Sequence, residues 1–207
     1  MTLDDAFQNL SPTTLADVLG RDRVMDIGIR PLWSDMPRVA GPAFTVRCSP
    51  GDNLMLHAAI HRAPAGSVIV VESGDLDYAL GGGNVCAVAK KRGVVAFVLD
   101  GLLRDVAEAR TSRFPVFARG VIPIPGKKDA LGSLGETVKC GGVRVGPGDI
   151  VVADEEGVVA IPVARAEAVL EAARARAAKD AAESLESWEA NHRARIDEIL
   201  RKKGFDG

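Results

Sequence analysis

The sequence has few aromatic residues, few cysteines and no long apolar run. Only 4% of its 207 residues are aromatic, so a core must consist mainly of Val, Leu, Ile and Ala. No apolar stretch approaches the roughly 20 residues that a membrane-spanning helix requires. The net charge is −2 and the basic residues are scattered, which gives no long-range field for nucleic acid. We therefore expect neither nucleic acid nor a membrane among the partners of this chain.

The three cysteines and the N-terminal residues indicate a reducing environment. Cys48, Cys86 and Cys140 form no Cys-x-x-Cys pair, which argues against a zinc knuckle or a thioredoxin-like site. We expect each of them to pack as a small apolar residue. Residues 1–8 are acidic rather than basic and show no pattern of a signal or transit peptide. The expected location is the cytoplasm.

Three familiar sequence patterns are absent or incomplete. The glycine run at 81–83 lacks both the Lys-Ser/Thr of a P-loop and the Gly-x-Gly-x-x-Gly spacing, so a nucleotide cofactor is not supported. His57 and His61 stand four apart, but Ala58 occupies the place of the zinc-protease glutamate, and a surface or interface pair is the favoured interpretation. Lys127 and Lys128 are interpreted as a solvated loop rather than a phosphate clamp.

Helices and strands alternate in the middle of the chain, which predicts an α/β fold. An N-terminal helix is expected from Ser11 to Gly20. We then expect a strand at 43–48, a helix following Asp52, a strand at 67–72, a helix at 85–92 and a strand at 94–99 that ends at Asp100. Short strands divided by Gly and Pro follow, at 116–117, 121–124, 138–145, 150–153 and 158–161. We place one domain at 1–162.

The last segment, 163–207, is rich in Ala and charged residues and predicts a long helical extension. Pairs such as Arg176 and Asp180 stand four apart and stabilise a helix by a few tenths of a kcal/mol each. So weakly amphipathic a helix gains little by packing on its own domain. A contact with a neighbouring subunit, through Leu185 and Trp188, and a solvated tail remain equal alternatives.

The segment Gly81–Asn84 and the pair Arg104 and Asp105 carry the main functional signal. A glycine loop exposes backbone N–H groups, and the helix after it directs its positive end at the same place, which suits a carboxylate. Arg104 adds a planar fork of donors for a carboxylate. Asp105 provides a hard oxygen ligand for a divalent metal. Together they predict a site for a small oxo-acid held against a metal ion. The alternative for Arg104 and Asp105 is a salt bridge at the end of a strand.

Several motifs, taken in order and spacing, resemble a known family almost from end to end of the chain. The chain is similar to the family that joins 4-hydroxy-4-methyl-2-oxoglutarate aldolases with the RraA-like regulators of ribonuclease activity. The resemblance lies in the segments IRPL at 29–32, AGPAFTV at 40–46, PGDNL at 50–54, LDGLLRD at 99–105 and PGDIVVAD at 147–154.

This resemblance implies a fold, an assembly and an activity. The fold would be a swivelling β/β/α domain with packed sheets and flanking helices, and the assembly a trimer or a dimer of trimers. The activity would be a metal-dependent, class II-type pyruvate aldolase with oxaloacetate decarboxylase activity, and the metal Mg²⁺ or Mn²⁺. Its alternative is a non-catalytic RraA-like regulator that binds a ribonuclease or another protein.

The resemblance also implies roles for individual residues. Arg104 would bind the carboxylate and keto region of pyruvate and stabilise the enolate, and Asp105 would hold the metal directly or through water. The backbone of Gly81, Gly82, Gly83, Asn84 and Val85 would hold the carboxylate. An acidic residue from the C-terminal helix of a neighbouring subunit would approach the metal, with Asp180 the better match and Glu183 the second.

One departure from the family pattern concerns position 83. The aldolases carry an acidic residue there, separated from the arginine by twenty residues, whereas this chain has Gly83. Asp75 or Asp77, from the preceding loop, is the expected substitute. The RraA-type regulators generally lack the acidic residue after the arginine, and because Asp105 is present here, the sequence favours the enzyme.

Overall fold

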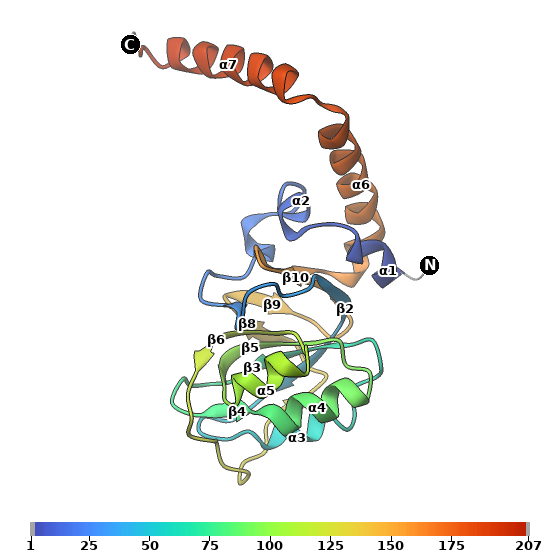
Figure 1. The fold of residues 1–207 in the computed structure, drawn as a ribbon, viewed down its shortest axis with the longest axis vertical. Helices are drawn as coiled ribbons and strands as arrows, with labels where there is room; N and C mark the ends of the chain where they lie inside the picture. The colour runs from blue at the N-terminus through green and yellow to red at the C-terminus, as the bar shows by residue number, and fades with distance from the viewer. Residues whose placement is uncertain (1–2, 206–207) are drawn as a thin grey trace. The chain divides into compact units, whose positions relative to one another are not determined.

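The computed structural model describes residues 3–205, whose contacts divide the chain into two units, Met1–Ala173 and Arg174–Gly207. Most of the secondary structure lies in the first unit (Figure 1). Its strands are β1 (Arg30–Pro31), β2 (Val39–Arg47), β3 (Val68–Glu72), β4 (Ala79–Gly81), β5 (Ala96–Leu103), β6 (Val116–Val121), β7 (Ser133–Leu134), β8 (Val138–Cys140), β9 (Val143–Val145), β10 (Ile150–Asp154) and β11 (Gly157–Ile161).

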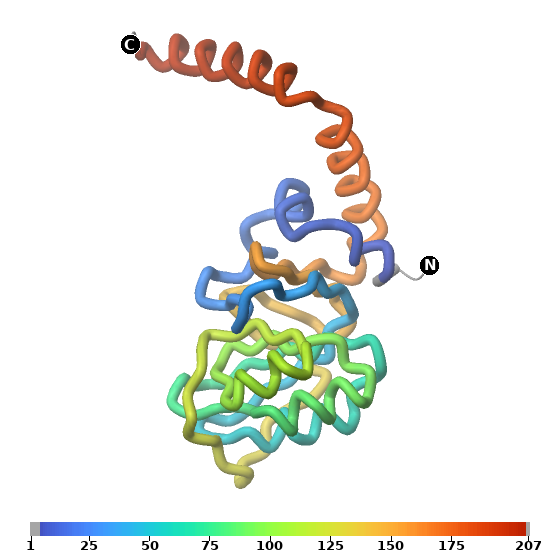
Figure 2. The backbone as a smooth tube through the Cα atoms, in the orientation of Figure 1, coloured from blue at the N-terminus to red at the C-terminus, as the bar shows by residue number. Residues whose placement is uncertain are grey.

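Nine of these strands form one mixed sheet in the order β1-β6-β5-β3-β2-β10-β11, with β4 beside β5 and β7 beside β2. The central neighbours β2, β3, β5 and β6 run parallel, whereas β1, β7, β10 and β11 pair antiparallel. Figure 2 shows β2 (blue) beside β10 (orange), although about a hundred residues separate them. Strands β8 and β9 form a separate hairpin. The mixed α/β fold that the sequence predicts is confirmed.

Both faces of the central strands are covered, which explains why they are almost continuously apolar. Ile69 and Val71 of β3 pack with the helices α3 (Leu54–Ala59), α4 (Gly83–Lys91) and α5 (Val106–Thr111). Val68 and Val70, on the other face, pack with the β8–β9 hairpin and β10. Figure 1 shows the three helices together on one side of the sheet.

The cysteines are free and buried in these two cores, as the sequence predicts. Burial raises the pKa of the Cys48 thiol to about 11 and that of Cys86 to about 12. Burial also raises the pKa of Cys140. Protonated thiols of this kind pack as small apolar groups.

Several predicted boundaries differ from the structure. Strand β5 continues past Asp100 to Leu103, and β6 is one strand where two short ones were expected. Asp100 tolerates an interior strand position because its carboxylate accepts hydrogen bonds from Arg119 Nε, at 2.7 Å, and from the Gly141 N–H, at 2.9 Å. Helix α2 covers only Pro12–Ala16; Ser11 caps it as expected.

The remaining helices lie at the two ends of the chain. They are α1 (Leu3–Gln8), the 3₁₀ turns Arg21–Arg23 and Val163–Arg165, α6 (Ala166–Ala182) and α7 (Leu185–Lys202). The single helix expected after residue 163 is therefore two helices. The first ends at Ala182, and Ser184 caps the second by accepting a hydrogen bond from the Ser187 N–H. No helix within residues 3–205 is long and apolar enough to cross a membrane.

Candidate functional site

A pocket of about 220 Å³ lies where β4 and β5 end and α4 begins. In sheets with parallel strands, ligands bind beyond the carboxyl ends of the strands. The pocket brings together six of the residues that the sequence predicts for the site: Gly81, Gly82, Asn84, Val85, Arg104 and Asp105. The seventh, Gly83, joins them through its backbone N–H, which lies 3.3 Å from Asp105 Oδ2.

The glycines of this turn leave space that neighbouring side chains fill. A Cβ atom on Gly82 would lie 2.3 Å from Asp105 Oδ2 and 2.9 Å from Arg104 Cγ. The two segments are joined by a hydrogen bond from the Arg104 N–H to the Gly81 carbonyl, at 3.0 Å. Gly82 is therefore required by the close approach of Arg104 and Asp105 rather than by its own backbone, which is extended.

Asp105 adopts a left-handed backbone conformation, with φ 53° and ψ 39°. This region is uncommon for residues other than glycine, although Asp and Asn tolerate it. Asp105 occupies the N-cap position of α5, yet its side chain makes no capping hydrogen bond to that helix. Its carboxylate instead turns toward the start of α4. The strained backbone thus releases the carboxylate from its own helix and presents it to the pocket.

Arg104 contributes a largely uncommitted guanidinium group. Its Nε lies 3.4 Å from Asp105 Oδ2, and both side chains are about two-fifths exposed. Among the residues that the structure describes, this ion pair is the one polar side-chain contact of Arg104. An ion pair of this length and exposure contributes little to stability. The remaining N–H groups are available to a ligand, so the salt-bridge alternative does not account for the whole arrangement.

Two side chains that were given no role in the site also line the pocket. They are His57, half of the predicted surface or interface pair, and Lys128, which is exposed in a loop as predicted; Asn53 lines the pocket as well. Burial and the charges of Lys128, His61 and Arg104 lower the pKa of His57 to about 4. The pocket therefore contains two cations, a neutral imidazole and the Asp105 carboxylate. A signal was present in the sequence, because Asn53 lies within the family segment at 50–54 and His57 follows it by three residues.

Asp105, the one acidic side chain among the residues that line the pocket, suits a hydrated divalent ion rather than an all-protein metal site. Within residues 3–205, no group of three or more His, Cys, Asp or Glu side chains is arranged to hold a metal. Asp105 nevertheless presents a hard oxygen to an open, glycine-lined space. Mg²⁺ keeps several waters and binds through one or two carboxylates, so the donor set fits it.

The two acidic residues expected from a neighbouring subunit lie in the second unit. Asp180 is on α6 and accepts a hydrogen bond from Arg176 Nε at 3.0 Å. Glu183 lies between α6 and α7, and its Oε1 accepts a hydrogen bond from Asn191 Nδ2 at 3.1 Å. Their approach to a metal in another subunit stays a prediction.

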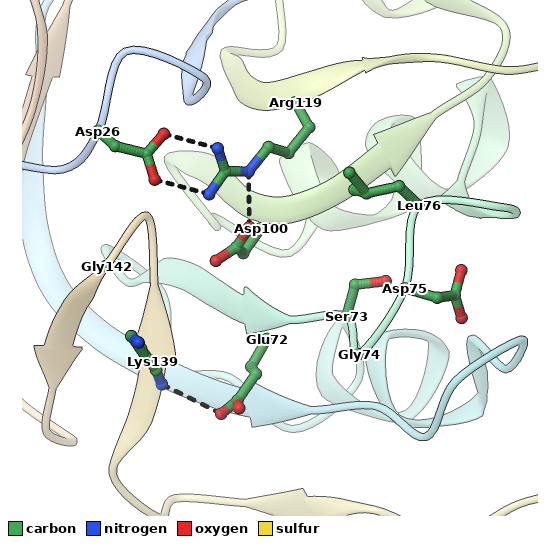
Figure 3. Close-up of a pocket in the computed structure, with 10 residues that line it drawn as sticks. All are labelled: Asp26, Glu72, Ser73, Gly74, Asp75, Leu76, Asp100, Arg119, Lys139 and Gly142. Carbon is green, nitrogen blue, oxygen red and sulfur yellow. Dashed lines mark hydrogen bonds and ion pairs between the residues drawn. The ribbon is translucent and has the colours of Figure 1, made fainter.

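A second, larger cavity of about 450 Å³ contains a different arginine (Figure 3). Arg119, on β6, lies between the carboxylates of Asp26 and Asp100. It donates two hydrogen bonds to Asp26, at 2.6 and 2.8 Å, and one to Asp100, at 2.7 Å. The hydrogen bonds from Arg119 lower the pKa of Asp26. Asp75, one expected substitute at position 83, lines this cavity, not the pocket of Arg104.

Comparisons with known proteins agree with this fold. Residues 3–160 match the RraA-like family profile, described as Aldolase/RraA. A protein of Halalkalibacterium halodurans named "Putative 4-hydroxy-4-methyl-2-oxoglutarate aldolase" is 34% identical over 200 residues, which cover 96% of this chain and 91% of that protein.

Two solved structures have the same fold. An uncharacterized protein from Pseudomonas syringae is 29% identical, with a TM-score of 0.77 over 91% of this chain and 93% of that one. RraAS2 of Streptomyces coelicolor, described as an unusual member of the RNase ES inhibitor RraA family, is 27% identical, with a TM-score of 0.72 over 93% and 97%. The profile match and the similarity to the Halalkalibacterium protein, which extends over nearly the whole chain, show that this chain belongs to the RraA-like family.

Proposed function

We propose that this protein is a metal-dependent lyase. It would cleave 4-hydroxy-4-methyl-2-oxoglutarate, or a related 4-hydroxy-2-oxo dicarboxylate, to pyruvate and a second oxo-acid, and would also decarboxylate oxaloacetate. The observation that carries the proposal is the pocket in which an uncommitted Arg104 and a strained Asp105 face the start of α4. The name of the Halalkalibacterium relative supports the same reaction class.

The side chains of the pocket suit a small substrate with two negative charges. Arg104 would hold one carboxylate and the keto oxygen with its planar fork of donors. The N–H groups of Asn84 and Val85 belong to the first turn of α4, where backbone donors have no partner within the helix. They would bind the same carboxylate. Lys128, which also lines the pocket, would attract the second one, and the neutral His57 adds no competing charge.

Bond cleavage leaves an enolate, and the pocket offers charge to stabilise it. Arg104 would neutralise negative charge developing on the former keto oxygen, which is the way preorganised donors lower a barrier. Asp105 would hold Mg²⁺ or Mn²⁺, directly or through water. When bound, such an ion acts as a Lewis acid on the keto group. We further propose a homotrimer or dimer of trimers, in which Asp180 or Glu183 of a neighbouring subunit completes the site.

A non-catalytic role is the second candidate, favoured by the similarity to RraAS2 of Streptomyces coelicolor. In that case the chain would bind a ribonuclease or another protein, and its pocket would have no turnover. The glycine at position 83, where the aldolases carry an acid, is consistent with this candidate. Asp105 favours the enzyme.

Release of pyruvate distinguishes the two candidates. The assay couples pyruvate from 4-hydroxy-4-methyl-2-oxoglutarate, or from oxaloacetate, to lactate dehydrogenase, with Mg²⁺, with Mn²⁺ and with EDTA. We expect turnover with the metal and its loss with EDTA. The lyase proposal fails if the folded protein releases no pyruvate above the uncatalysed rate from either substrate, and the binding role would then be preferred.

A further inference from the structure

Two consecutive glycines at the start of α4 make room for two carboxylates. The first, Gly82, accommodates Asp105 as described above. At the second, Gly83, a Cβ atom would lie 1.8 Å from Glu108 Oε2 and 2.7 Å from Glu108 Cβ and Cδ. The carboxylate of Glu108 therefore occupies the volume that a side chain at position 83 would fill.

Local geometry places Glu108 and Asp105 on the same side of α5. Glu108 lies in the first turn of this helix, and its N–H donates to the Asp105 carbonyl at 3.0 Å. Residues three apart on a helix are neighbours on its surface. Both carboxylates thus lie against the first residues of α4, one beside Gly82 and one beside Gly83.

We propose that Glu108 is the proton acceptor of this site, an inference that rests on the proposed lyase function. Glu108 is not among the residues that line the pocket, but its carboxylate lies beside Gly83, between the lining residues Gly82 and Asn84 in the sequence. Two of the side chains that do line the pocket are cations. Lys128 in its charged form has no lone pair, and Arg104 stays protonated. His57 lies on α3, whereas the Glu108 carboxylate lies with that of Asp105 against the start of α4, where the proposed metal would hold the substrate. Asp105 is the proposed metal ligand, which leaves Glu108.

The proton transfer is balanced within the reaction. Glu108, directly or through one water, accepts the proton of the C4 hydroxyl group. The O–H electron pair becomes the second bond of the new carbonyl, and the C3–C4 bond breaks with its electron pair entering the pyruvate enolate. Glu108 then returns the proton to C3, which completes pyruvate. No oxidant or reductant is needed.

The test combines cleavage with a half-reaction. In D₂O with Mg²⁺, the enzyme should exchange the methyl protons of pyruvate, which NMR follows directly. For Glu108→Gln we expect both kcat for cleavage and the exchange rate to fall about 100-fold or more, with KM nearly unchanged. Glu167→Gln, a matched change in the first turn of α6, should leave both rates within about twofold. Thermal unfolding checks that the variants are folded.

A positional exchange makes the test specific for the place of the carboxylate. Gly83→Asp combined with Glu108→Ala puts an acid into the vacated volume. We expect at least about tenfold recovery over Glu108→Ala alone. A folded Glu108→Gln variant with normal kcat, or a folded double variant without recovery, would overturn the role of Glu108 but not the lyase. A wild type with neither cleavage nor exchange would overturn both.

Discussion

The two arginines of this protein, each beside aspartates, show how the same residue types serve different ends. Arg119 forms three side-chain hydrogen bonds with Asp26 and Asp100, and its guanidinium is about one-quarter exposed. Arg104 is more exposed, and within residues 3–205 its one ion pair, with Asp105, has a length of 3.4 Å. In the first group the protein supplies the partners of the arginine. In the second, the donors of the arginine are left for the ligand that we propose. The first group therefore stabilises the fold, and binding is the role proposed for the second.

Arg104→Lys should produce the largest effect on activity. Lysine keeps the charge but loses the two-pronged geometry, so we expect kcat/KM for pyruvate release to fall about 100-fold or more. The midpoint of thermal unfolding should change little, because the ion pair is exposed. Equal activity of wild type and variant in the coupled assay would show that Arg104 does not take part in the reaction.

Arg119→Met should reverse this pattern. It leaves Asp26 and Asp100 without their partner, and we expect the free energy of unfolding to fall by about 1–3 kcal/mol. Both carboxylates keep some contact with water, which limits the loss. Urea titration measures it. At a temperature where the variant is folded, kcat/KM should stay within about twofold of wild type. A large loss of activity in the folded variant would show that the two groups are coupled.

His57 should give the smallest effect, visible in the pH dependence of stability. Its pKa is about 4 in the folded protein and ~6.5 in the unfolded chain. Between these values the unfolded chain binds the proton and the folded protein does not, so the free energy of unfolding falls as the pH decreases from 6.5 to 4. For this partly exposed group we expect about 1 kcal/mol. Urea titrations at pH 7 and pH 4.5 should show a smaller difference for His57→Gln; equal differences would contradict the assignment.

Local signals in the sequence predicted much of the fold. The apolar run at 67–72 indicated a strand buried on both faces, and β3 has that environment. The predicted end of β5 was wrong because an aspartate usually marks the end of a strand. The residues that hold Asp100 inside the strand, Arg119 and Gly141, are 19 and 41 residues away in the sequence. Pairing at that distance leaves no local pattern.

The residues of the candidate site also divide into those that a local pattern reveals and those that only the folded chain brings together. Gly81–Val85 and Arg104–Asp105 were predictable because each is a short segment whose chemistry is apparent on its own. His57 and Lys128 reach the pocket from α3 and from a loop, and their proximity depends on tertiary packing. Glu108 was missed because the space beside Gly83 is visible only when α4 and α5 are placed together.

The left-handed backbone at Asp105 has a consequence for how members of this fold diverge. Asparagine tolerates the same conformation as aspartate, and their codons differ by one base. A single substitution at this position would therefore remove a charge from the pocket while the turn, the helix after it and the sheet stay as they are. Selection could then retain the scaffold for recognition of another protein. A change from enzyme to regulator would in that case leave the backbone structure almost unchanged.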